Sequence, residues 1–139
     1  MRILRVSIPL LVAVAFAWGC EHAPPFEAAG GPTTATFASI QANIFSRSCA
    51  ITQCHIGSSA PLGLDLSDGR AFGNLVKVRS AQVPALFRVD PGAPDSSYLV
   101  LKVEGVGGIV GAQMPRGRAP LAQDEINAIR QWIAGGANP

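Results

Sequence analysis

The residues of this chain most able to do chemistry are two cysteines and a histidine in the run Cys49-Ala-Ile-Thr-Gln-Cys54-His55. This C-x4-C-H pattern is a widened form of the C-x-x-C-H signature for covalent attachment of c-type haem. In that chemistry both thiols add to the haem vinyl groups as thioethers, and the adjacent imidazole binds the iron. The run therefore predicts one covalent haem c, held by Cys49, Cys54 and His55.

A second iron ligand is available far downstream. Apart from the initiator Met1, the chain has one methionine, Met114, which lies between a Gly-rich segment and Pro115. Its place in a loop, rather than on an apolar helical face, argues against simple core filling. A His/Met axial pair is typical of electron-transfer cytochromes c and raises the reduction potential. We expect His55 and Met114 to be the two ligands of the metal.

Two other interpretations of the cysteines remain open. A disulfide between Cys49 and Cys54 is compatible with four intervening residues in an exported protein, but it leaves His55 unexplained. A structural zinc site needs four ligands, and the only other histidine, His22, lies in a segment that reads as solvated.

The first twenty residues have the pattern of an export signal. Arg2 and Arg5 form a positively charged N-terminal region. The apolar stretch over residues 8–17 is shorter than the about 20 residues that a membrane-spanning helix needs. We therefore predict that residues 1–20 direct export, and we expect a periplasmic protein. This location agrees with the haem prediction, because haem is joined to c-type cytochromes outside the cytoplasmic membrane.

The processing of this leader has two interpretations. Ala15-Phe16-Ala17 is an A-x-A cleavage site, which would release a protein that starts at Trp18. Alternatively, Ala17-Trp18-Gly19-Cys20 resembles a bacterial lipobox, although Trp18 is bulky for its position. We favour lipidation at Cys20, because this thiol would otherwise be unpaired in an oxidising compartment. The expected result is a lipid anchor to the membrane.

The charge balance argues against a nucleic-acid partner. Two of the 11 Lys and Arg residues fall in the leader, which leaves nine against 9 Asp and Glu in the mature chain. The mature chain also has no basic run and no basic patch interleaved with aromatic residues. We expect redox proteins as partners and no nucleic acid.

The rest of the chain divides into a tether and one domain. Residues 21–35 are rich in Pro, Gly, Ala and Thr without apolar periodicity, and predict a flexible tether. Residues 36–139 form the domain. There the patterns predict helices from an N-cap at Thr36 to Cys49, within 68–78, over 98–103 with a cap, and over 122–134, and an extended loop over 57–66.

This organisation predicts a mainly α, loop-rich fold. The domain has few aromatic residues and many glycines, so its regular structure alone would build a thin core. A buried haem would supply a large, rigid apolar centre for the loops to wrap.

Several stretches together resemble the class I cytochrome c domain, and more narrowly bacterial exported cytochromes c with widened haem sites. They are Ile44 through His55, Met114-Pro115, Leu121 through Ala137, and short stretches such as Gly63-Leu64-Asp65-Leu66 and Ser97-Tyr98-Leu99. The resemblance covers nearly all of residues 36–138. It implies crossing N- and C-terminal helices around a haem, with Trp132 packed near it. The departure is the spacing, since two extra residues must bulge between the thiols.

The expected function is electron transfer by this single haem, without catalysis of a substrate reaction. Arg88, Arg116 and Arg118 are candidates to neutralise the haem propionates. One alternative is a peroxidase-like enzyme or the haem subunit of an exported dehydrogenase, if Met114 leaves the iron. Another is a non-haem binding module stapled by a Cys49–Cys54 disulfide.

Overall fold

The structure, a computed structural model, describes residues 32–139. The predicted export signal, Cys20 and residues 21–31 of the tether lie outside the described residues. The described part is mainly helical and loop-rich, as predicted, with two isolated β-bridges, Val76 with Val89 and Arg79 with Phe87. Its helices are α1 (Phe37–Ile40), η1 (Gln41–Cys49), α2 (Ala71–Leu75), α3 (Tyr98–Glu104) and α4 (Gln123–Ala134), with short 3-10 turns η2 (Pro61–Gly63) and η3 (Pro94–Ser96).

The predicted N-terminal helix is confirmed from its cap to its last residue. The Thr36 hydroxyl accepts a hydrogen bond from the Ser39 N–H at 3.3 Å, which satisfies one of the free amides of the first turn. The helix then continues from α1 into η1 and ends at Cys49. In η1 the backbone widens to π-helical geometry, which apolar periodicity alone does not predict.

The C-terminal helix α4 also forms where it is predicted. The Glu125 carboxylate accepts a hydrogen bond from the Ala122 N–H at 2.9 Å and so fixes the entry into the helix. Its apolar face is buried, and Gly136, with a φ of +99°, turns the chain away after the helix ends. The buried residues of this face are Ile126, Ala128, Ile129, Trp132 and Ile133.

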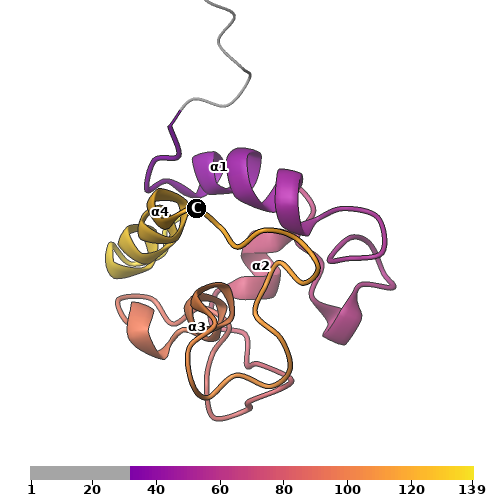
Figure 1. The fold of residues 1–139 in the computed structure, drawn as a ribbon. Helices are drawn as coiled ribbons and strands as arrows, with labels where there is room; N and C mark the ends of the chain where they lie inside the picture. The colour runs from indigo at the N-terminus through magenta and orange to yellow at the C-terminus, as the bar shows by residue number, and fades with distance from the viewer. Residues whose placement is uncertain (1–31) are drawn as a thin grey trace, which may run out of the picture.

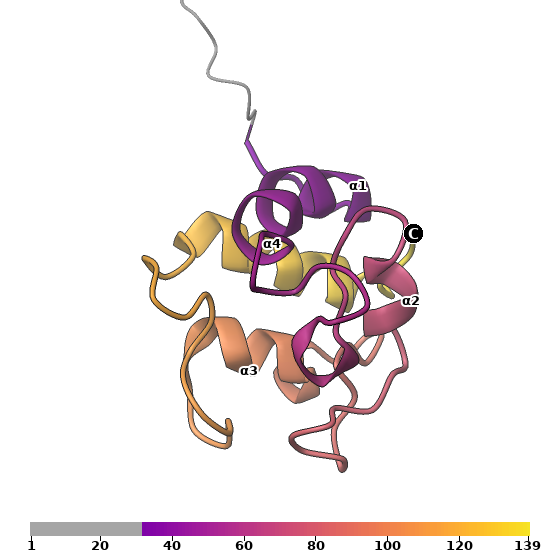
Figure 2. The same cartoon turned by 90° about the vertical axis from the view of Figure 1, so that its right-hand side faces the viewer.

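Helix α1 and its continuation η1 lie against α4 (Figures 1 and 2). The Phe37 and Trp132 rings meet at this crossing, with centroids 5.4 Å apart. Apolar residues of both helices form the centre of the core, including Ile40, Ile44, Ile129 and Ile133, each 0% exposed. The crossing therefore joins the two ends of the domain and builds most of its apolar interior.

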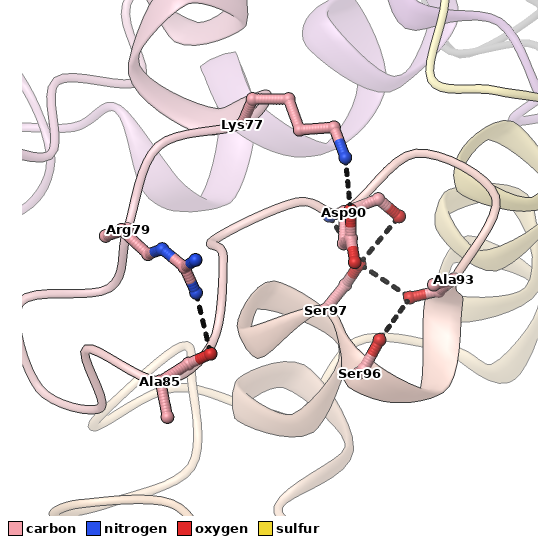
Figure 3. Close-up of polar contacts among 7 residues, drawn as sticks. All are labelled: Lys77, Arg79, Ala85, Asp90, Ala93, Ser96 and Ser97. Atoms are coloured by element: carbon pink, nitrogen blue, oxygen red, sulfur yellow. Dashed lines mark hydrogen bonds and ion pairs between the residues drawn. The ribbon is translucent and has the colours of Figure 1, made fainter.

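The segment between α2 and α3 is tied by polar contacts instead of a sheet (Figure 3). Lys77 Nζ pairs with Asp90 Oδ1 at 2.6 Å across the segment. The buried Ser97 hydroxyl accepts from the Asp90 N–H and donates to the Ala93 carbonyl, both at 2.9 Å. These bonds hold an irregular stretch against the start of α3.

The short helix predicted within residues 68–78 forms as α2 over Ala71–Leu75. One local prediction needs correction: helix α3 forms, but Ser97 at its N-cap makes no capping bond, because its hydroxyl bonds to the preceding segment.

The loop over 57–66 is non-helical except for the short turn η2. Its leucines do not share one face, since Leu62 is 57% exposed and Leu66 is 2% exposed. Within residues 32–139, no helix is long and apolar enough to cross a membrane.

Candidate functional site

A cavity of about 370 Å³ brings together all four predicted site residues of the domain, namely Cys49, Cys54, His55 and Met114. Cys49 comes from the end of η1, Cys54 and His55 from the turn that follows, and Met114 from the loop between α3 and α4. Most other lining side chains are apolar, among them Pro61, Leu62, Leu64, Leu66, Leu75, Leu99 and Val103. The cavity is therefore an apolar chamber with a thiol, thiol and imidazole group on one segment and a thioether on another.

The turn after η1 shows how the widened spacing is accommodated. The His55 N–H donates to the Cys49 carbonyl at 3.0 Å, and the Cys54 N–H donates to the Ile51 carbonyl at 2.9 Å. Between them Gln53 adopts a left-handed φ of +68°, which lets the chain reverse within a few residues. The extra residues are thus taken up by a closed turn that keeps both cysteines and the histidine on one cavity.

The imidazole of His55 is held by a backbone carbonyl. Its Nδ1 lies 3.1 Å from the Leu64 oxygen, and because a carbonyl only accepts, Nδ1 carries the proton of this bond. Burial lowers the pKa of His55, an effect that the Leu64 hydrogen bond opposes. The Nε2 lone pair of a neutral ring is therefore free to bind a metal, the usual arrangement of a histidine ligand. Sequence reasoning missed this partner, because a backbone carbonyl has no residue signature.

Both cysteines of the turn are free thiols. Burial raises the pKa of Cys49 to about 12, with a further rise from the neighbouring Cys54. Burial therefore keeps this thiol in its protonated form near neutral pH. Within residues 32–139, no three His, Cys, Asp or Glu side chains gather in a metal-binding group.

Met114 is placed by its backbone. Its N–H donates to the Lys102 carbonyl of α3 at 2.8 Å, and the neighbouring Gln113 side-chain amide donates to the Val103 carbonyl at 2.8 Å. The loop that carries the thioether is thus attached to the last turns of α3.

Among residues 32–139, the charged side chains that line the cavity are cationic. They are Arg88, Lys102, Arg116 and Arg118. Arg88 donates to the carbonyls of Leu62 and Asn74, each at 2.8 Å, and burial lowers the pKa of its guanidinium. Arg116 and Arg118 are exposed at the rim. The three predicted arginines therefore do reach one cavity, and Lys102 is a fourth cation that the sequence reasoning did not single out.

Trp132 is not among the residues that line the cavity. Its ring packs on Phe37, and its Nε1–H donates to the Asn138 carbonyl at 2.7 Å. The ring therefore does not form part of the cavity wall, and its expected packing near a haem stays a prediction. Trp132 instead stabilises the helix crossing and the C-terminal turn.

No family model, curated protein or solved structure was found that matches this chain. The residues and their geometry are therefore the basis for assigning a function.

Proposed function

We propose that this protein binds one covalent haem c through Cys49, Cys54 and His55, with Met114 as the second axial ligand, and transfers single electrons. The observation that supports it best is the convergence of these four side chains, from segments about sixty residues apart, on one apolar cavity. The closed turn after η1 brings both thiols and the imidazole to that cavity together.

The chemistry of the cavity wall fits a haem. Its leucines and Val103 suit an apolar macrocycle, and its cationic groups suit the two propionates that a haem carries. Arg116 and Arg118 are the better candidates for the propionates, because Arg88 already donates to two backbone carbonyls.

A bound haem would supply a one-electron iron couple. The chain would supply the rest. Leu64 orients the His55 ring through its carbonyl, and the apolar wall keeps water away from the site. Met114 and His55 would hold the iron together, and this ligand pair favours electron transfer over reactions that need a free ligand position.

The proposed location and partners of the protein follow from its N-terminal segment. We propose export to the periplasm and attachment to the membrane by a lipid at Cys20, with redox proteins as partners. The domain would then work at a membrane surface.

The proposal is tested with the full chain, expressed with its own leader in a bacterium that matures c-type cytochromes. We expect a red mature protein whose mass includes one haem and whose haem survives denaturation. Replacing both thiols, as Cys49→Ser with Cys54→Ser, should remove the covalent haem. Ser48→Ala, beside the same cavity, should leave it in place.

One result would refute the proposal directly. A colourless wild-type protein, lighter than its reduced form by a pair of hydrogens, would show a Cys49–Cys54 disulfide in place of thioethers. The alternative of a disulfide-stapled binding module would then stand.

A further inference from the structure

Lys102 is a buried residue in the last turn of α3. The residue is only 8% exposed, although lysine is rarely buried without a charged partner. Among the ion pairs of residues 32–139, none includes Lys102. Partial burial of an ammonium group is costly, so its hydrogen-bond partners must compensate for the lost hydration.

Those partners are two carbonyls of the loop that leads to Met114. Lys102 Nζ donates to Val110 at 3.0 Å and to Ala112 at 2.6 Å. The Lys102 backbone carbonyl accepts from the Met114 N–H at 2.8 Å. One residue of α3 is therefore bonded to three positions within five residues of the loop.

Without such contacts, the glycine-rich loop that leads to Met114 would be mobile. Its glycines include Gly105, Gly107, Gly108 and Gly111, and residues 105–108 are exposed. Fixing each residue costs backbone entropy, and glycine loses more freedom than any other residue. Figure 2 shows this segment folding back beside α3 before the chain rises to α4.

Neutral contacts assist at other points of the loop. The Tyr98 hydroxyl accepts from the Val110 N–H at 3.0 Å, and Gln113 donates to the Val103 carbonyl. The Lys102 bonds differ because their donor is an ammonium group, which makes them the stronger, charge-assisted kind.

We infer that Lys102 is a positioning residue that holds the loop over residues 110–114 against α3 and thereby presents the Met114 sulfur to the cavity. This inference rests on the proposed function for the identity of the group that the sulfur meets. The holding of the loop itself does not depend on a bound haem, so the two can be tested separately.

The experiment compares Lys102→Leu with wild type in the full chain. Leucine keeps an apolar side chain and a similar helix propensity, removes the donor and adds no second thioether to the cavity. The matched control is Lys77→Leu, which loses the same charge from a lysine whose side chain is 58% exposed and pairs with Asp90.

The first measurement is amide hydrogen exchange at Val110 and Met114, whose N–H groups bond to α3. We expect about ten- to a hundredfold faster exchange in Lys102→Leu, because charge-assisted bonds are removed from a locally opening segment. The exchange of these amides in Lys77→Leu should match wild type.

The second measurement is the ferric absorption spectrum of the haem-loaded protein, in the weak band that reports a methionine sulfur on iron. Lys102→Leu should lose much of this band while its mass still includes the covalent haem, and Lys102→Arg should restore it. Met114→Leu provides the reference for complete loss of sulfur ligation.

Unchanged exchange and an unchanged sulfur band in Lys102→Leu would overturn the inference. If that variant does not fold, Lys102→Gln, which keeps a neutral donor, is measured in its place with the same criteria. A wild-type protein without haem would refute the proposed function instead, and the exchange measurement would still decide the role of Lys102.

Discussion

At the scale of single residues, the turn around Asp65 supports the histidine of the site. Its neighbour Leu64 provides the carbonyl that accepts from His55. The Asp65 carboxylate accepts from the Ser67 hydroxyl at 2.7 Å and from the Ser67 N–H at 3.0 Å. These two bonds, the hydroxyl bond first, hold the pKa of Asp65 below its ordinary value of 3.8.

We expect Asp65→Asn to lower the free energy of unfolding at neutral pH but not in acid. A carboxylate with a depressed folded-state pKa stabilises the fold above its unfolded pKa, and this contribution disappears as the pH falls through the folded value. The difference in unfolding free energy between the two proteins should therefore be constant near neutral pH and should disappear below about pH 4. Denaturant unfolding at a series of pH values measures it.

A difference that widens toward acid would contradict this account of Asp65. Asp68→Asn is the control, since this carboxylate is exposed on the same stretch of chain and bonds only to the adjacent Gly69 amide.

At the scale of elements, the helix formed by α1 and η1 links the core to the site. Its first turn is capped by Thr36, its middle buries Ile40, Ile44 and Phe45, and its last residue is Cys49. Cys49, the first residue of the candidate site, is therefore the last residue of a well-buried helix. Its position depends on how that helix packs.

We expect Thr36→Ala to destabilise the protein by about 1 kcal/mol, the usual cost of losing an N-cap side chain. Covalent haem attachment should be unchanged, because the cap lies at the opposite end of the helix from Cys49. Thermal or denaturant unfolding provides the measurement, with the exposed Ser59→Ala as control. An effect as small as that of the control would show that tertiary packing alone sets the start of this helix.

At the scale of the whole molecule, stability depends on a small core beneath many loops. The fully buried side chains cluster where the first helix crosses α4, and the cavity opens beside them along α2 and α3. Ile129 of α4 is 0% exposed within this cluster but does not line the cavity. It therefore reports on the core separately from the site.

We expect Ile129→Ala to cost about 2–5 kcal/mol of unfolding free energy and Ile129→Val about 0.5–1.5 kcal/mol. The larger truncation leaves a void that a thin core cannot readily close. Equilibrium unfolding of both variants measures the two losses of unfolding free energy. Similar losses for the two would contradict a tightly packed helix crossing at this position.

Much of this architecture could be predicted from local patterns in the sequence. Apolar residues at helical spacing, with Thr36 before them and Gly135-Gly136 after the last helix, determined where the terminal helices begin and end. The grouping of Cys49, Cys54 and His55 was equally local, because these residues lie within a single turn of chain. Met114 could also be singled out from the sequence, because it is the only methionine of the domain.

Only the tertiary structure decided which distant groups meet. The Leu64 carbonyl on His55, the Val110 and Ala112 carbonyls on Lys102, and the placement of Trp132 away from the cavity all depend on the path of loops. Any residue supplies a backbone carbonyl, so such partners leave no trace in residue identity. They are determined when the chain closes on itself, and here they orient the histidine and hold the methionine loop.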